Sequence, residues 1–267
     1  MSAMLKTFIR LSMILLSLFS IGAQADILDD ILKRGTVRVG VALFTPWTMK
    51  RENGQLYGYE IDVAEKIAQD MGVKPEFKVY NWEDIIAGLE EGEIDVIAGG
   101  MAITPARALK VNFSLPYLQS GVTLATNTEL TKNINKLEQL NRPEIVIATV
   151  AETLAADVAQ RLFDKADIKI FPTSEAAEKE ILEGNVHVYL ASMPEVKFLA
   201  LQYPDKVDLP LSEPLLASKA GLAVKKGEQE WLNFLNAWVT AREADRWLIT
   251  AQKYWFDSLQ WSEETKQ

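Results

Sequence analysis

The stretch GGMAITPAR, residues 99–107, holds the side chain with the clearest chemical potential in the chain, Arg107. Pro105 suits the first turn of a helix, and Thr104 before it is a good N-cap residue. The N–H groups at such a helix start have no partners within the helix and attract an anion. Arg107 lies within reach of the same point, and a guanidinium can hold a carboxylate through two parallel hydrogen bonds. This stretch alone fits a carboxylate-binding arginine and an exposed helix arginine equally well.

Other reactive residue types are scarce. The chain has one histidine, His187, and no cysteine. His187 falls on an apolar strand, where a lone histidine is more often structural than catalytic. We therefore predict no metal, and the missing cysteines exclude disulfides and thiol nucleophiles. No phosphate-binding loop or nucleophile elbow occurs, so we predict no cofactor and no catalytic residue. The formal net charge of −9, with no basic stripe, argues against a nucleic-acid partner.

Strand and helix patterns alternate on both sides of Arg107. The first set has strands at 35–42, 74–80 and 94–100, with helices at 59–72 and 82–93. The second set has strands at 144–149, 167–172 and 186–192, with helices at 153–166 and 174–184, and Ser174 is the expected N-cap of the last helix. The predicted fold class is therefore α/β, with two lobes that are each a mostly parallel sheet flanked by helices.

Two extended apolar segments, about 120–127 and 217–224, connect these units and are predicted as hinge crossings. The second crossing returns the chain to the first unit. We expect lobe 1 to comprise 26–121 plus 220–267, and lobe 2 to comprise 126–218. Open α/β sheets bind ligands at the C-terminal ends of their strands, so the cleft between the lobes is the expected site.

The first 25 residues have the pattern of an export signal. Lys6 and Arg10 precede an apolar run, and Ala23-Gln24-Ala25 offers a small-residue cleavage site, so we predict cleavage after Ala25. The apolar run is short for a membrane span, which favours cleavage over an uncleaved anchor. Without a cysteine to carry a lipid, the exported protein is expected in the periplasm.

The C-terminal region is rich in tryptophan. Trp231, Phe234, Leu235 and Trp238 recur at helical spacing. A tryptophan cluster can form a carbohydrate or membrane surface, but this spacing favours amphipathic helices that pack on lobe 1.

From Asp26 onward the chain resembles the periplasmic solute-binding proteins that deliver amino acids to ABC uptake systems, bacterial extracellular solute-binding protein family 3, with the type II periplasmic binding fold. The matching motifs, in order, are GQLYGYEIDVAEKIA (54–68), WEDIIAGLEEGEIDVIAGGMAITPAR (82–107), VNFSLPYLQSG (111–121), LEGNVHVYLASMPEV (182–196) and GLAVKKG (221–227). The resemblance implies two hinged lobes that close on a small-molecule carboxylate. It also implies an inner-membrane ABC permease as partner and a monomeric protein.

The resemblance assigns roles to individual positions. It implies that Arg107 grips the α-carboxylate of the ligand, helped by Gly100, Ala102 and the helix start at Thr104. It also implies that aromatic side chains after the first strand and at the second helix start pack on the ligand's side chain; these are Phe44, Trp47 and Trp82.

Three positions depart from the family pattern. Ser192 stands where members that bind an α-amino acid usually have an aspartate for the ammonium, and Val41 stands where a second acidic residue often follows the first strand. Glu152-Thr153-Leu154 replaces the usual Gly-Thr-Thr or Gly-Thr-Gly of lobe 2. Because a buried ammonium without a carboxylate is costly, the aspartate-to-serine exchange is expected to cost amino-acid binding about 2–5 kcal/mol.

These departures leave three interpretations open. In the first, the ligand has no charged amine, and its apolar or aromatic body packs against Val41, Phe44, Trp47, Trp82, Val150 and Leu154. In the second, Glu152 supplies the negative charge from a shifted position, although a glutamate at a helix start more often complements the helix dipole. In the third, the pocket no longer binds a solute.

Two functions from different classes fit these patterns. The favoured one is a non-enzymatic periplasmic receptor that closes by hinge motion on an amino acid or related small carboxylate and is then recognised by a permease. The alternative is an enzyme like cyclohexadienyl dehydratase, which acts on prephenate or arogenate; the chain shares with it GG-x-x-x-T-x-x-R and FS-x-PYL. Such an enzyme needs a general acid, and Glu152 is the one candidate that the sequence suggests. A detached sensor module would share all these features with a transport protein.

Overall fold

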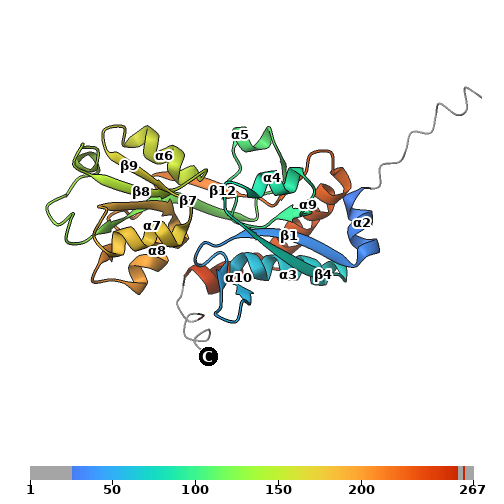
Figure 1. The fold of residues 1–267 in the computed structure, drawn as a ribbon. Coiled ribbons are helices and arrows are strands. Elements are labelled where there is room, and N and C mark those ends of the chain that lie inside the picture. Colours follow the sequence, from blue (N-terminus) through green and yellow to red (C-terminus); the bar gives the residue numbers. More distant parts are fainter. Residues whose placement is uncertain (1–25, 258–260, 262–267) are drawn as a thin grey trace, which may run out of the picture.

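The computed structural model describes residues 26–257 and Trp261. The predicted signal peptide, residues 1–25 with cleavage after Ala25, lies outside the described residues. The described strands form two α/β lobes that lie end to end (Figure 1). Within this part of the chain, no helix has both the length and the apolar character needed to cross a membrane.

The first lobe is built on a five-stranded sheet with the order β4-β1-β5-β13-β6. Strand β1 runs parallel to β4 and β5, and β13 runs antiparallel to β5 and β6. Its helices cover both faces, because apolar clusters lie on each side of the sheet. The elements are α2 (Ile27–Arg34), β1 (Thr36–Ala42), β2 (Met49–Lys50), β3 (Leu56–Tyr57), α3 (Tyr59–Met71), β4 (Lys74–Tyr80), α4 (Ile85–Glu90), β5 (Val96–Ile97), α5 (Pro105–Ala108), β6 (Asn112–Phe113), β13 (Ala223–Val224), α9 (Gln229–Ala244) and α10 (Trp247–Phe256).

The second lobe is built on a sheet with the order β11-β7-β10-β8-β9, and β12 also pairs with β7. Strands β10, β8 and β9 are parallel, whereas β7 runs antiparallel to β10. Apolar clusters again lie on both faces. The elements are β7 (Leu118–Asn127), a 3-10 helix (Leu137–Leu140), β8 (Val146–Val150), α6 (Leu154–Leu162), β9 (Asp167–Phe171), α7 (Ser174–Leu182), β10 (Val188–Ser192), α8 (Met193–Gln202), β11 (Val207–Asp208) and β12 (Leu216–Ala220).

Two neighbouring strands join the lobes. Strands β7 and β12 are paired antiparallel from Leu118–Ala220 to Val122–Leu216, and they run side by side between the lobes (Figure 1). Strand β7 then continues into the sheet of the second lobe, where it pairs with β10. Within residues 26–257 the chain therefore passes between the lobes twice, at the paired strands β7 and β12.

The predicted α/β class with two lobes is confirmed, and several local predictions need correction. Helix α6 ends at Leu162 rather than at residue 166. Strand β5 is shorter than the predicted 94–100, because the chain turns toward the cleft at Gly99 and Gly100. Helix α4 begins at Ile85 rather than at residue 82. The N-cap of α7 is Thr173 and not Ser174, since the Thr173 side chain accepts a hydrogen bond from the Ala176 N–H.

The C-terminal tryptophans pack inside the protein, as their spacing predicts. Trp231, Trp238 and Trp255 are buried in the core of the first lobe. Their indole N–H groups donate to the Asp95 carbonyl, to Asp70 and to Asp62, respectively. Trp261 is also buried and stacks on Phe198 of α8, with 5.1 Å between the ring centroids. Trp261 thus contacts α8 of the second lobe and Trp255 of the first.

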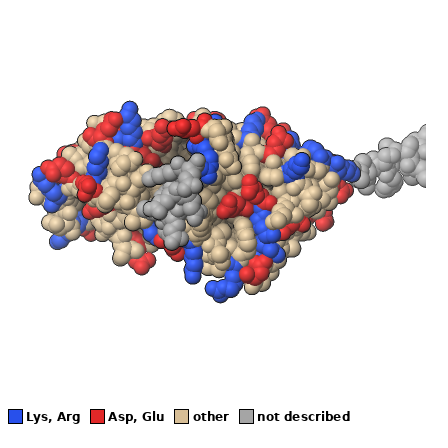
Figure 2. Space-filling model, turned by 90° about the horizontal axis from the view of Figure 1, so that it is seen from below, with Lys and Arg blue, Asp and Glu red and all other residues tan. Residues whose placement is uncertain are grey.

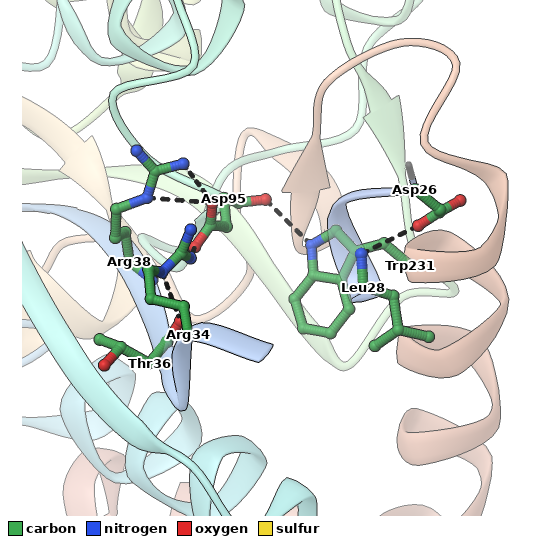
Figure 3. Close-up of polar contacts among 7 residues, drawn as sticks. All are labelled: Asp26, Leu28, Arg34, Thr36, Arg38, Asp95 and Trp231. Atoms are coloured by element: carbon green, nitrogen blue, oxygen red, sulfur yellow. Dashed lines mark hydrogen bonds and ion pairs between the residues drawn. The ribbon is translucent and has the colours of Figure 1, made fainter. Parts of the chain in front are cut away.

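A buried carboxylate, Asp95, ties four elements of the first lobe together (Figure 3). Its side chain is fully buried and accepts hydrogen bonds from the guanidinium groups of Arg34 and Arg38. The Arg38 backbone N–H also donates to it, at 2.7 Å. The Asp95 carbonyl accepts the indole N–H of Trp231 at 2.9 Å. Asp95 therefore links α2, β1 and α9 to the strand that leads into the cleft.

Asp95→Asn is expected to destabilise the protein by about 2–3 kcal/mol, because it leaves two partly buried guanidinium groups without their anion. The measurement is equilibrium unfolding in urea. Glu129→Gln removes an exposed ion pair with Lys132 and serves as the control, with an expected change below about 0.5 kcal/mol. Equal effects of the two variants would show that Asp95 does not hold these elements together.

Candidate functional site

A cleft between the lobes holds a small cavity of about 80 Å³ that is partly open to solvent. The ends of β1 and β5 and the loop before α5 form one wall, and β8, β10 and the starts of α6 and α8 form the other. The predicted site residues that line it are Phe44, Trp47, Trp82, Gly100, Ala102, Arg107, Val150, Thr153, Leu154 and Ser192. The protein thus brings together residues that are far apart in the sequence.

Three predicted site residues do not line this cleft. Val41 is fully buried in the core on β1. Thr104 caps α5, where its hydroxyl accepts a hydrogen bond from the Arg107 N–H at 3.2 Å. The side chain of Glu152 is exposed, and its carbonyl rather than its carboxylate faces Arg107. Glu152 is therefore not positioned to supply negative charge inside the cleft.

Arg107 reaches across the cleft from the first lobe. Its Nη2 donates to the Glu152 carbonyl at 2.8 Å, and its Nη1 donates to the Ala102 carbonyl at 3.1 Å. The guanidinium also lies 5.6 Å from the ring of Trp82. Burial lowers the pKa of Arg107, which nearby Asp157 and Glu152 offset only in part.

Across residues 26–257, no carboxylate comes within ion-pair distance of Arg107. Its partners are neutral carbonyl oxygens, which compensate a guanidinium less well than a carboxylate does. The cleft therefore contains a largely buried positive charge with the geometry to receive an anion.

Glu152 has a backbone conformation that L-residues rarely adopt, with φ at 57°. This conformation directs its carbonyl toward the first lobe, where it accepts hydrogen bonds from Arg107 and from the indole N–H of Trp82 at 3.1 Å. Trp47 makes a further contact between the lobes by donating to the Ser192 hydroxyl at 3.0 Å. The lobes are thus held together around the cleft by hydrogen bonds from three cleft-lining side chains.

A buried tyrosine, Tyr117, supports the loop before α5. Gly100 has a φ of 61°, and an added Cβ would lie 2.8 Å from the ring of Trp47, so only glycine fits without a shift. The Gly100 N–H donates to the Tyr117 hydroxyl at 3.2 Å, and this hydroxyl donates to Glu60 at 2.7 Å. Burial raises the pKa of Glu60 to about 8, although its hydrogen bonds partly oppose the shift.

Glu60→Gln is expected to change the pH dependence of stability. Because the folded-state pKa of Glu60 lies above its ordinary value, the folded protein keeps a proton that the unfolded chain releases between about pH 4.5 and pH 8. Wild-type stability should therefore fall as pH rises through this window. Relative to wild type, the variant should gain about 1.4 kcal/mol per pH unit.

The measurement is the free energy of unfolding in urea for both proteins at several pH values from 5 to 9. A difference between wild type and variant that does not change with pH would contradict a protonated Glu60 in the folded protein.

Among the lining residues that sequence reasoning missed, Glu195 is the one with an ionisable carboxyl group. It lies in the first turn of α8 and is buried, and it accepts hydrogen bonds from Ser174, Tyr189 and Ser192. Burial raises its pKa. Its spacing of three residues from Ser192 places both on the same side of a helix start, which is the signal that could have identified it.

His187 has a structural role, since its Nδ1 accepts a hydrogen bond from the Val146 N–H at 3.2 Å. Burial lowers its pKa. Within the described residues, no group of three or more His, Cys, Asp or Glu side chains could hold a metal ion. On the face seen from below, basic and acidic side chains are interspersed, and neither forms a stripe (Figure 2).

The sequence model of the bacterial extracellular solute-binding proteins, family 3, matches residues 37–258. The chain belongs to this family. The resemblance predicted from the motifs is thus confirmed, and so is the fold, because this solute-binding protein also matches solved structures of the same two-lobed type.

An ancestral amino acid-binding protein, a precursor of cyclohexadienyl dehydratase, is 33% identical with a TM-score of 0.79, over 87% of this chain and 100% of the other. A putative binding component of an ABC transporter from Wolinella succinogenes, complexed with lysine, is 31% identical with a TM-score of 0.81, over 86% and 99%. The cyclohexadienyl dehydratase of Pseudomonas aeruginosa is 23% identical over 91% of each chain. Binding proteins and an enzyme thus both resemble this solute-binding protein.

Proposed function

We propose that this protein is the periplasmic binding component of an ABC uptake system for an amino acid or a related small carboxylate. The observation that carries the proposal is Arg107, a cation in the cleft whose guanidinium donates, within the described residues, to carbonyl oxygens and to no carboxylate. A ligand carboxylate would replace the Glu152 carbonyl and give the guanidinium the charged partner that it lacks. The relative from Wolinella succinogenes, complexed with lysine, supports an amino-acid ligand.

Binding would act through closure of the two lobes. Lobe 1 would comprise 26–121 plus 220–267 and lobe 2 would comprise 126–218, with hinges near 120–127 and 217–224. Arg107 extends from the first lobe, whereas Ser192 and Glu195 lie on the second, so a ligand that contacts both walls binds the closed form better than the open form. That difference in affinity would drive closure, and an inner-membrane permease would then recognise the closed protein, which acts as a monomer.

The body of the ligand would lie against an aromatic wall. Phe44 and Trp82 meet edge to face, with ring centroids 5.5 Å apart, and Trp47 lies beside Gly100. Val150 and Leu154 face them from the second lobe. These surfaces favour an apolar or aromatic ligand body.

A dehydratase on the same scaffold is the second candidate, and Glu195 is the observation in its favour. A dehydratase needs a carboxylic acid to protonate the departing hydroxyl as prephenate loses water and carbon dioxide to give phenylpyruvate. Glu195 is a cleft-lining carboxyl group whose pKa is raised by burial, which suits a proton donor better than the exposed Glu152 does. The likeness to the Pseudomonas aeruginosa enzyme supports testing this activity.

One experiment separates the two functions. Isothermal titration calorimetry with the twenty amino acids should find at least one ligand, and incubation with prephenate should yield no phenylpyruvate above the uncatalysed rate. Phenylpyruvate formation without binding of any amino acid would reverse the assignment.

Arg107→Ala is expected to weaken binding of the best amino acid from that panel by more than tenfold, at least about 1.4 kcal/mol, because the carboxylate loses both guanidinium hydrogen bonds. Arg161→Ala is the control, since Arg161 is exposed on α6 and does not line the cleft. The measurement is the affinity of both variants for this amino acid by calorimetry. Unchanged affinity in Arg107→Ala would show that Arg107 does not bind the carboxylate.

A further inference from the structure

We propose that Glu195, and not the side chain at position 192, binds the α-ammonium group of the ligand. The inference rests on the proposed binding function and narrows the ligand to an α-amino acid. An ammonium group needs a negative charge in the cleft. Neither Ser192 nor Glu152 places a carboxylate there, whereas Glu195 lines the cleft.

The hydrogen bonds around Glu195 fix where its neighbours' protons lie. The Ser174 hydroxyl lies 2.6 Å from Glu195 Oε1 and 3.1 Å from Glu178 Oε1. A hydroxyl has one hydrogen, so it can donate to only one of these carboxyl groups. If Ser174 donates to Glu195, its oxygen can accept a hydrogen bond from a protonated Glu178.

The same arrangement leaves the negative charge on Glu195. Tyr189 and Ser174 both donate to its Oε1, and Ser192 donates to its Oε2 at 3.3 Å. Burial raises the pKa of Glu195, and its three O–H donors oppose that rise by favouring the ionised form. Glu178 has no such set of donors, and burial together with the charge of Glu195 raises its pKa to about 8. Two nearby carboxyl groups thus share one negative charge, and it lies on the one that lines the cleft.

Glu195 has no cation of the protein as a partner. Throughout the described chain, no lysine, arginine or histidine nitrogen lies within ion-pair distance of it. Arg107 and Glu195 therefore present opposite charges to one cleft, one from each lobe, and each lacks a charged partner. A ligand with a carboxylate and an ammonium group complements both.

Ser192 completes the recognition of the amine. Its hydroxyl accepts the indole N–H of Trp47 and donates to Glu195, so its position is fixed from both sides. A serine here keeps the carboxylate of Glu195 oriented, whereas an aspartate would add a second charge within hydrogen-bond reach of the first. This accounts for a serine at this position in a protein that binds an amine.

The test measures affinity for amino acids against their analogues without the α-amino group. The probe pairs are L-phenylalanine and 3-phenylpropanoate, L-leucine and 4-methylpentanoate, and L-lysine and 6-aminohexanoate, titrated calorimetrically into wild type, Glu195→Gln, Glu178→Gln and Glu175→Gln. Glu175 is exposed on the same helix as Glu178, so Glu175→Gln controls for loss of a carboxylate outside the cleft.

For any pair that wild type binds, the amino acid should bind at least tenfold more tightly than its analogue. Glu195→Gln should lose that preference by weakening the amino acid at least tenfold, with the analogue unchanged within twofold, which also shows that the variant is folded. Glu178→Gln and Glu175→Gln should keep the preference.

A preference that survives in Glu195→Gln would overturn the inference, as would a loss in Glu178→Gln as large as that in Glu195→Gln. Wild type that binds the analogues as tightly as the amino acids would also overturn it, while the proposed carboxylate-binding function would stand. If none of these pairs binds, the same comparison is made with the best amino acid from the calorimetric panel and its analogue without the α-amino group, and binding of no amino acid at all counts against the proposed function itself.

Discussion

The charge of Arg107 is the constraint on which the rest of the cleft depends. A guanidinium that is largely buried needs strong acceptors, and here it has two carbonyl oxygens, one from its own loop and one from the opposite lobe. The carbonyl from the opposite lobe belongs to Glu152, whose φ of 57° is a conformation that costs energy in any residue but glycine. The closed arrangement therefore holds Arg107 with a substitute acceptor in a strained backbone, which a carboxylate ligand could displace.

The architecture below the cleft keeps that arginine in place. Asp95 fixes the strand that leads to the glycine loop by binding two arginines, and the chain from Gly100 through Tyr117 to Glu60 supports the loop itself. On the opposite lobe, a network around Glu195 does the same for the other wall. Both walls thus rest on buried carboxyl groups that hold the surrounding elements in place.

Much of the fold and part of the cleft followed from local sequence patterns. Hydrophobic periodicity predicted β1, α3 and β4, and the Thr-Pro step predicted the cap of α5, because these depend on neighbours in the chain. Glu195 and the Glu152 carbonyl did not follow from the sequence, since one depends on how α7 packs against α8 and the other on a single backbone angle. Val41 was misplaced for a related reason: whether a residue at a strand end faces the core or the cleft is set by tertiary packing.

The most direct test of the central claim is a crystal structure of the protein with a bound amino acid. Our account predicts ligand carboxylate oxygens at about 2.7–3.1 Å from both Nη atoms of Arg107, with the Glu152 carbonyl no longer its partner. A bound amino acid whose carboxylate lies elsewhere, with Arg107 still donating to Glu152, would contradict it.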